Sequence, residues 1–185
     1  MTPTTLEAAA GQRAGTLVLA VLSVEIDRVA ALIDELEAAS YEPARRDSGK
    51  GLREVLAIPR AIGSVAYCDG ILAGISVAAP LESFGHALGG FPDDEFGKHS
   101  TLYFVDTTVD SRMRRRGIGR ALKVAQLGTA RVQGYRYASG RNRVVLADGM
   151  LALNISLGGR ILTRIANAYS DGIHPDSAHY YRITL

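Results

Sequence analysis

The chain has 185 residues, of which 47% are hydrophobic and 22% are charged, and this is typical of one globular domain with a core of its own. Its net charge of +2 argues against a surface that binds nucleic acid as a whole. The one cysteine excludes an internal disulfide and favours a reducing compartment, and the four scattered histidines give no spacing typical of a zinc site, so no metal is expected.

The N-terminal part is expected to be a disordered tail, residues 1–13, and residues 14–185 are expected to form one domain. The apolar stretch 15–24 is too short to span a bilayer, and no A-x-A cleavage site follows it. A buried first strand at about residues 15–22 is therefore favoured over a leader peptide, which is the alternative, and the expected location is the cytoplasm.

A helix is predicted after this strand, because Ser23 is a suitable N-cap and apolar residues then recur at helical spacing. These apolar residues are Ile26, Val29, Ile33 and Leu36. Residues 40–54 are rich in charge and glycine, so they predict a loop or a second short helix.

The dipeptide Asp69-Gly70 predicts a two-residue hairpin turn between strands at 62–68 and 71–79, because it supplies the positive φ angles of that turn. Residues 80–100 contain several glycines and prolines and predict a long loop. Four acidic residues in or beside it either receive a cationic amine or serve only solubility. They are Glu82, Asp93, Asp94 and Glu95.

The C-terminal half predicts a strand at 102–109, an arginine-rich turn and then a helix. The apolar face of this helix is formed by Ile118, Ala121, Leu122, Ala125, Thr129 and Val132. A short strand at 135–139, a helix at 150–157 and two strands at 160–169 and 179–185 are expected to follow. The succession predicts a mixed α/β (α+β) fold.

The segment 107–123 places a strand, a basic turn and a helix start in succession. The first N–H groups of a helix have no intrahelical acceptor, and the helix dipole adds partial positive charge there. Gly117 and Gly119 leave the backbone accessible, and the neighbouring arginines can add charge-assisted contacts. The segment therefore predicts an anion site suited to a pyrophosphate, although neither G-x-x-x-x-G-K-[ST] nor G-x-G-x-x-G is present.

The run Arg114-Arg115-Arg116-Gly117-Ile118-Gly119 resembles the R/Q-x-x-G-x-G/A motif with which the GNAT acyltransferase superfamily binds coenzyme A. Upstream, Thr108-Val109-Asp110 resembles the end of the family's fourth strand, and downstream, residues 150–158 resemble the family's M-L-x-x-N-x-x-L-G-F helix. The resemblance covers residues 100–160 and implies the GNAT fold, a twisted, mostly antiparallel sheet flanked by helices.

The resemblance also implies an activity, the transfer of an acetyl group from acetyl-coenzyme A to a primary amine by direct attack within a ternary complex. The amine is expected to belong to a small molecule, with a peptide N-terminus or a protein lysine as the second choice. The amide of Val109 is expected to stabilise the thioester oxygen. The residues expected to bind the coenzyme are Thr107, Thr108, Val109, Arg114, Arg115, Arg116, Gly117, Ile118, Gly119, Arg120 and Asn154.

The sequence departs from the family pattern at four positions. Gly159 replaces the usual phenylalanine, Ala147 replaces an asparagine, and Arg143 lies near another expected asparagine. Asn154 stands where many members carry the tyrosine that protonates the departing thiolate. An amide cannot donate that proton, so Asn154 is expected to hydrogen-bond the pantetheine arm instead.

Several residues are candidates for proton transfer. Asp106 is a candidate base acting through water, or else an exposed strand-face carboxylate, and His99 is a second candidate base or a surface histidine. Tyr169 and Tyr180 are candidate proton donors to the thiolate, or else core and rim residues.

Other interpretations stay open from the residues alone. A GNAT-fold domain that binds acyl-coenzyme A as a silent sensor would also carry this turn and lack the tyrosine. Five arginines within residues 112–120 are also compatible with nucleic-acid binding, although no basic stripe with interleaved aromatics supports it. We expect neither a nucleic-acid partner nor a membrane partner, and by analogy with the superfamily a homodimer.

Overall fold

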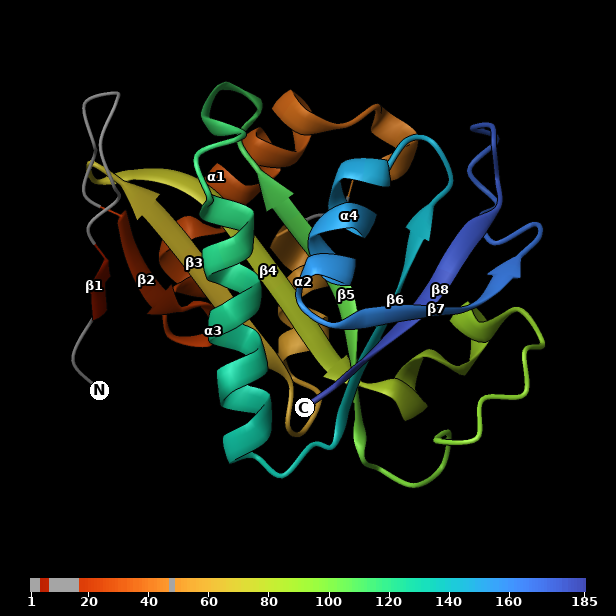
Figure 1. The fold of residues 1–185 in the computed structure, drawn as a ribbon. Coiled ribbons are helices and arrows are strands. Elements are labelled where there is room, and N and C mark those ends of the chain that lie inside the picture. Colours follow the sequence, from red (N-terminus) through yellow and green to blue (C-terminus); the bar gives the residue numbers. More distant parts are fainter. Residues whose placement is uncertain (1–3, 7–16, 47–48) are drawn as a thin grey trace. The chain divides into compact units, whose positions relative to one another are not determined.

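The computed structural model of the chain describes residues 4–6, 17–46 and 49–185 (Figure 1). Within these ranges the strands are β1 (Thr4–Leu6), β2 (Leu17–Val21), β3 (Ile62–Cys68), β4 (Ile71–Pro80), β5 (Thr101–Val109), β6 (Tyr137–Arg143), β7 (Gly159–Ile165) and β8 (Ala178–Thr184). The α-helices are α1 (Leu22–Ser40), α2 (Gly49–Leu56), α3 (Ile118–Val132) and α4 (Asp148–Ser156). Short 3-10 helices are η1 (Pro43–Arg45), η2 (Leu81–Leu88) and η3 (Ser111–Met113).

The strands follow the order β1-β2-β3-β4-β5-β6-β8-β7 in one sheet. Strands β1 to β4 pair antiparallel with their neighbours, as do β6, β8 and β7. Strands β5 and β6 pair in parallel, and only over residues 101–103 and 137–139. The predicted fold class, a mixed fold with a mostly antiparallel sheet, is confirmed.

The described residues form two compact units, the first within Met1–Ala78 and Asp106–Gln126, the second formed by Ala79–Val105 and Leu127–Leu185. Strands β4 and β5 contribute residues to both units. One domain over residues 14–185 stays a prediction.

The tail expected to be disordered, residues 1–13, contains β1, because the backbone of Thr4–Leu6 pairs with β2. The rest of that tail lies outside the described residues. Helix α1 begins at Leu22, one residue before the expected N-cap Ser23, whose side chain also lies outside the description.

In the first unit, α1 and α2 lie behind the strands and α3 lies in front of them (Figure 1). The rear core joins apolar residues of the two helices to those of β3 and β4, namely Ile26, Ile33, Leu36, Leu52, Val65, Leu72, Ile75 and Val77. The front core joins α3 to the sheet through Ala66, Cys68, Ala73, Ile118 and Leu122. Helix α3 is therefore fixed to the sheet directly after the predicted anion-binding turn.

The hairpin between β3 and β4 is the predicted one. Asp69 and Gly70 have φ angles of 52° and 78°, and Cys68 pairs with Ile71 across the turn. Two successive positive φ angles match the right-handed twist of the strands, which is why a two-residue turn suffices.

In the second unit, residues 80–100 are more ordered than a plain loop. They begin with η2, because Leu81, Ala87 and Leu88 are buried in a core with Tyr103 and Tyr180. Strand β6 starts two residues later than expected and runs on to Arg143, since its ladder with β8 continues to that residue. Strand β7 ends at Ile165, before a residue with positive φ, Asn167.

Candidate functional site

The turn that joins β5 to α3 is fixed at its first residue, the buried Asp110. Asp110 donates its N–H to the carbonyl oxygen of Ala73 on β4, at 3.0 Å. Its carboxylate accepts the N–H of Arg112 at 2.8 Å and forms an ion pair with the Arg112 guanidinium at 2.6 Å. Hydrogen bonding from the Arg112 side chain holds the pKa of Asp110 below its usual range. The turn therefore starts from a defined point on the sheet.

The end of the turn leaves backbone N–H groups open. Arg115 and Gly117 have positive φ angles, 66° and 82°. Ala121 donates its N–H to the carbonyl oxygen of Gly117 at 3.0 Å. The N–H groups of Ile118 and Gly119 therefore precede any intrahelical acceptor. A Cβ at residue 117 would meet nothing within 4 Å, so this side of the turn is open. A helix start with these properties suits a phosphate group.

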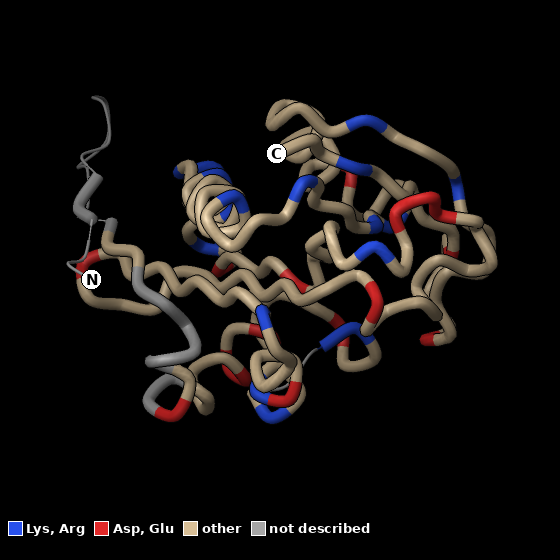
Figure 2. Tube along the Cα trace, turned by 90° about the horizontal axis from the view of Figure 1, so that it is seen from below, with Lys and Arg blue, Asp and Glu red and all other residues tan. Residues whose placement is uncertain are grey.

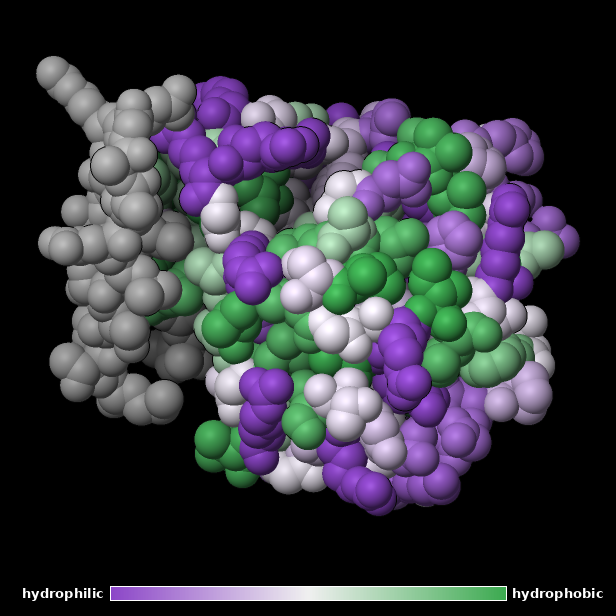
Figure 3. All heavy atoms as spheres, viewed as in Figure 1, coloured by the Kyte–Doolittle hydropathy of each residue, from purple (hydrophilic) through white to green (hydrophobic). Residues whose placement is uncertain are grey.

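The arginines of the turn are exposed, and Figure 3 shows hydrophilic side chains gathered over the N-terminal end of α3. Arg112 is already used in the ion pair described above. The Nε of Arg114 donates to the carbonyl oxygen of Val109, in a long bond of 3.4 Å. Arg115 and Arg116 have exposed side chains, and α3, seen end-on in Figure 2, carries lysine and arginine but no acidic residue. The positive charge predicted for this turn is thus accessible to an anion.

The backbone N–H groups at the end of β5 point in two opposite directions. The N–H of Asp110 points to β4, and a Cβ at Gly74 on β4 would lie only 2.7 Å from the carbonyl oxygen of Thr108. Because backbone groups alternate in direction along a strand, the N–H of Val109 points away from β4. The parallel ladder with β6 ends at residue 103 of β5. This direction is compatible with the predicted role of Val109 as an oxyanion donor, which stays a prediction.

The side chain of Thr107 takes part in a hydrogen-bond network on the face of β5 that is directed toward α3. Its Oγ1 lies 2.7 Å from the Oγ of Ser76 and donates to the carbonyl oxygen of Asp106 at 2.8 Å. The Oγ of Ser76 donates to the Oε1 of Gln126 at 2.6 Å. The Nε2 of Gln126 donates to the carbonyl oxygen of Ile62 at 3.1 Å. The network joins β3, β4, β5 and α3, so only the backbone of Thr107 is available for the predicted coenzyme contact.

On the other face of β5, Asp106 and Thr108 meet Tyr41, a residue that sequence reasoning missed. The Oγ1 of Thr108 donates to the Oδ1 of Asp106 at 3.1 Å and lies 3.2 Å from the Tyr41 hydroxyl. Burial, and next the Asp106 carboxylate, raise the pKa of Tyr41 to about 12. No motif surrounds Tyr41 in the sequence, so no sequence signal could have found it. Asp106 is half-buried and hydrogen-bonded, unlike the freely exposed carboxylate considered as its alternative.

Helix α3 also buries a lysine. Lys123 is 2% exposed, and burial lowers its pKa to about 7, while the Asp106 carboxylate acts in the opposite direction. The predicted apolar face of α3 was therefore wrong in part: Thr129 and Val132 are exposed, and the buried face continues from Leu122 through Lys123, Gln126, Leu127 and Ala130.

In the second unit, Asn154 lies on α4 and is fully buried. Its Nδ2 donates to the Oδ1 of Asn142 on β6 at 3.0 Å. This donor is therefore used within the protein, and the predicted contact of Asn154 with pantetheine stays a prediction.

Arg143, the residue near an expected asparagine, organises the segment between β7 and β8. Its side chain is 3% exposed, forms an ion pair with Asp171 and donates to the carbonyl oxygen of Ile173. Its guanidinium lies 3.8 Å from the ring centroid of Tyr169, and that of Arg141 lies 4.5 Å from the same centroid. Tyr169, the candidate proton donor, is thus stacked against two cations.

Tyr180, the other candidate proton donor, is fully buried in the core, and its hydroxyl donates to Asp93. Burial raises the pKa of Tyr180 above its usual range. Arg182 forms ion pairs with Asp93 and, at 2.9 Å, with Asp94. These acidic residues therefore already have a cationic partner.

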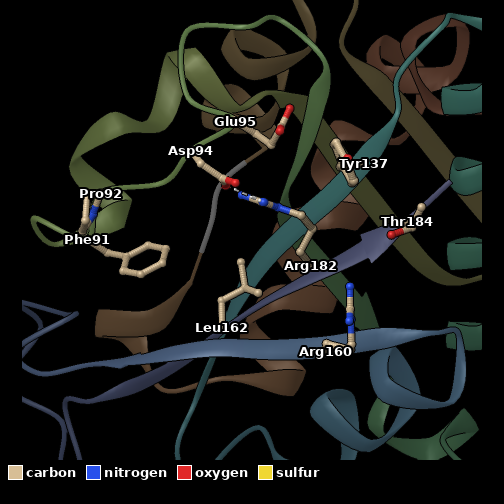
Figure 4. Close-up of a pocket in the computed structure, with 9 residues that line it drawn as sticks. All are labelled: Phe91, Pro92, Asp94, Glu95, Tyr137, Arg160, Leu162, Arg182 and Thr184. Carbon is tan, nitrogen blue, oxygen red and sulfur yellow. Dashed lines mark hydrogen bonds and ion pairs between the residues drawn. The ribbon is translucent and has the colours of Figure 1, made fainter.

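A cavity of about 480 Å³ lies in the second unit. Figure 4 shows the Arg182–Asp94 pair among the residues that line it. Its lining is mixed in charge and consists of Phe91, Pro92, Asp94, Glu95, Tyr137, Arg160, Leu162, Arg182 and Thr184.

The other two acidic residues of the 80–100 segment are also engaged. Glu95 forms an ion pair with Lys98 at 3.0 Å. Glu82 accepts the N–H of His99 at 2.7 Å, and His99 has a positive φ of 52° and a largely exposed ring. Their contacts support a structural role in this segment; docking of an amine by any of the four stays a hypothesis.

The structure thus brings the predicted residues of β5, the turn and the start of α3 together in the first unit, while Asn154, Tyr169 and Tyr180 lie in the second. Across the described ranges, no helix combines the length and apolar character that crossing a membrane requires. The described side chains also include no group of three or more histidine, cysteine or acidic residues arranged to hold a metal.

Comparisons with models of known protein families and with curated proteins gave no match. Solved structures do match. The ribosomal-protein-S18-alanine N-acetyltransferase from Escherichia coli has a TM-score of 0.67 at 18% identity, over 91% of this chain and 93% of that chain. The yncA protein from Salmonella typhimurium, solved with its cofactor acetyl-CoA, has a TM-score of 0.65 at 13% identity, over 91% and 94%.

The GphF GNAT-like decarboxylase, in complex with isobutyryl-CoA, has a TM-score of 0.67 at 21% identity, over 90% of this chain and 98% of that chain. At such identities the likeness establishes the fold, and one fold hosts more than one chemistry. The chain has the GNAT fold, as its resemblance implied.

Proposed function

We propose that this chain is an N-acetyltransferase that moves the acetyl group of acetyl-coenzyme A to a primary amine of a small molecule. The observation that carries the proposal is the open helix start at Gly117, Ile118 and Gly119, placed directly after a strand whose last N–H, that of Val109, points away from its neighbour β4. This is a phosphate site next to a backbone donor.

In the proposed complex, the N–H groups of Ile118 and Gly119 hold the pyrophosphate, and the exposed Arg115 and Arg116 add charge-assisted contacts. The pantetheine arm follows the backbone of Thr107 and Val109. The positive φ of Gly117 and the open space beside it fit this arrangement, because any side chain there would project toward the ligand.

The proposed reaction is a direct acyl transfer. The amine nitrogen attacks the thioester carbon, a C–N bond forms, the C–S bond breaks, and the amine proton and the thiolate charge must be accommodated. Val109 donates its N–H to the oxygen that gains charge. Asp106 receives the amine proton through water. Much of the rate enhancement comes from holding both substrates together.

The proton for the thiolate is assigned to Tyr169, because Asn154 carries an amide and Tyr180 is buried against Asp93. Asn154 itself is proposed to contact pantetheine through its Oδ1, while its Nδ2 stays bonded to Asn142. Homodimer formation and a cytoplasmic location remain expectations of the sequence.

A silent acyl-coenzyme A sensor is the second candidate, and one observation favours it. Position 154 holds a fully buried amide bonded to Asn142, so the proton donor found there in many relatives is absent. The same turn would then bind the coenzyme without turnover.

The test is release of free thiol from acetyl-coenzyme A over a panel of polyamines, amino acids, aminoglycosides and peptides, with calorimetric titration of the coenzyme in parallel. Amine-dependent thiol release supports the transferase. Coenzyme binding without release from any amine supports the sensor. Indifference to coenzyme A, together with an affinity for DNA or RNA that falls steeply with salt, would reject both.

A further inference from the structure

The cavity of the second unit has a floor that is formed by one face of strands β6, β8 and β7. Arg160 of β7 pairs directly with Arg182 of β8, and Tyr137 of β6 pairs directly with Thr184 of β8. Directly paired residues of antiparallel strands point to the same face, and so do residues two positions apart on one strand. The four side chains therefore share one face, and all four line the cavity.

The wall of the cavity is held against this floor by ion pairs and a ring contact. Arg182 forms ion pairs with Asp93 and Asp94, and the buried Asp93 also accepts the hydroxyl of Tyr180. The ring of Phe91 packs against the ring of Tyr180, with 5.7 Å between the centroids. The cavity thus has fixed walls, and its volume of about 480 Å³ is in the range of sites for small molecules.

The charges around the cavity leave one guanidinium available. Asp94 is paired with Arg182 at 2.9 Å, and Glu95 is paired with Lys98 at 3.0 Å. Arg160 is exposed and has no ion pair with any residue of the described ranges. Like charges in directly opposite positions of neighbouring strands repel each other, so an anion beside Arg160 and Arg182 is favourable. The cavity therefore suits a ligand with one negative charge.

A β-bulge brings an apolar side chain to the same cavity. The register of β7 and β8 shifts between Ile161 and Thr163, so Leu162 is an extra residue on β7. Bulges re-aim a side chain and are frequent beside functional sites. Leu162 is 39% exposed, and in the view of Figure 4 it lies between Phe91 and Arg160. A ligand that contacts all three must carry an apolar group next to its anion.

A simpler role for Arg160 follows from its place on β7, the last strand of the sheet order. Charged side chains on edge strands hinder pairing with another chain. That role requires neither a cavity nor polar neighbours. Tyr137 and Thr184 add two hydroxyl groups on the face that carries Arg160, and hydroxyl groups donate to a carboxylate. The combination is typical of an anion site rather than of a protected edge.

We propose that this cavity binds a small organic acid, with its carboxylate on Arg160, Thr184 and Tyr137 and its apolar group against Leu162 and Phe91. A planar guanidinium binds a carboxylate through two parallel hydrogen bonds, and its single charge matches that of the carboxylate. All residues of the site belong to the second unit. The inference therefore does not depend on the proposed transfer reaction.

The first test is an NMR titration of the full, ¹⁵N-labelled chain with 3-phenylpropionate, without coenzyme. The acid should bind with a dissociation constant of about 1 mM or tighter and shift the amide signals of the residues that line the cavity. The uncharged 3-phenylpropanamide, which has nearly the same shape, should bind about tenfold more weakly. Equal binding of the two probes, shifts confined to residues outside the cavity, or no saturable shift at all would overturn the proposal.

The second test repeats the titration with variants. Arg160→Gln should weaken binding of the acid by about tenfold, and Arg160→Lys by about threefold, because lysine keeps the charge but not the two-pronged geometry. Leu162→Asn should weaken it by about threefold through the lost apolar contact. Arg164→Gln removes the same charge from the same strand, outside the cavity lining, and should leave the affinity unchanged. The amide spectra show whether each variant is folded. An affinity of Arg160→Gln within twofold of wild type, or an equal loss in Arg164→Gln, would reject Arg160 as the anion site.

Discussion

In the turn before α3, Arg114, Arg115 and Arg116 are exposed, whereas in the second unit the Arg143 side chain is 3% exposed and the Arg182 side chain 12%. The exposed group has one long contact to a carbonyl oxygen. The buried group forms ion pairs with Asp171, Asp93 and Asp94 and donates to backbone carbonyl oxygens.

The difference follows from desolvation. A guanidinium taken out of water requires carboxylates and carbonyl oxygens around it, so a buried arginine is committed to its own fold. An exposed arginine gains little from any single ion pair and stays available for an external anion. The same residue type therefore stabilises one unit and is free to bind a ligand in the other.

The largest effect is expected at a buried arginine that is paired within the fold. Arg143→Met should lower the free energy of unfolding by about 3–5 kcal/mol, because it leaves the Asp171 carboxylate without its cationic partner and the Ile173 carbonyl without the guanidinium donor. Urea unfolding measures this. The control Arg160→Met, at an exposed position on β7, should change stability by less than about 0.5 kcal/mol. Equal losses in both variants would contradict the comparison.

Next comes the turn itself. Gly117→Glu should weaken coenzyme binding by about 100-fold or more, because the new side chain projects into the open space and its charge opposes the phosphates. Isothermal calorimetry with acetyl-coenzyme A measures the loss. Gly128→Glu adds the same charge to the same helix, away from the turn, and should leave the affinity unchanged. An unchanged affinity in Gly117→Glu would remove the turn from the proposed site.

The first unit also buries a cationic side chain, that of Lys123. It differs from the buried arginines of the second unit because a lysine can lose its proton and an arginine cannot. Burial lowers the pKa of Lys123 to about 7 from an ordinary 10.5. Between these values the unfolded chain binds more protons than the folded one, so stability rises with pH across this window.

Lys123→Met should therefore raise the free energy of unfolding at pH 7 by about 1–3 kcal/mol and flatten its rise toward pH 10. Urea unfolding at a series of pH values measures both effects. A destabilised variant with an unchanged pH dependence would show that the ammonium group is stabilised by its contacts in the folded state.

The smallest effect concerns the available arginines. Arg115→Ala and Arg116→Ala should each weaken coenzyme binding by about three- to tenfold, with the loss shrinking at high salt, and leave stability nearly unchanged. Calorimetry at two salt concentrations measures this. Arg131→Ala, at the other end of α3, is the matched control and should have no effect on affinity. A loss of stability comparable to that of Arg143→Met would show that Arg115 and Arg116 stabilise the fold, as the buried arginines do.

Local signals predicted much of this molecule. The turns at Asp69-Gly70 and at Gly117 could be predicted because the backbone freedom of single residues determines the geometry of a turn. The strand, turn and helix from β5 to α3 were predicted within a few residues. The glycines and prolines between residues 80 and 100 predicted a plain loop. The burial of Leu81 and Leu88 in a core of the second unit was therefore not predicted.

Partners distant in sequence could not be predicted. The contact between Tyr41 and Thr108 joins residues 67 positions apart, and the pair of Arg143 and Asp171 joins residues 28 apart. A single sequence carries no signal for such pairs. The turn was therefore predictable in outline, whereas the groups that fix Asp106 and Tyr169 were not.

Gly74 shows how far the influence of one missing side chain extends. It contacts no proposed ligand, yet a methyl group there would collide with the carbonyl oxygen of Thr108 and displace the strand end that carries Val109. A mutational scan would score position 74 as if it belonged to the coenzyme pocket. The spacing between β4 and β5 therefore helps to determine where the thioester of the proposed ligand is bound.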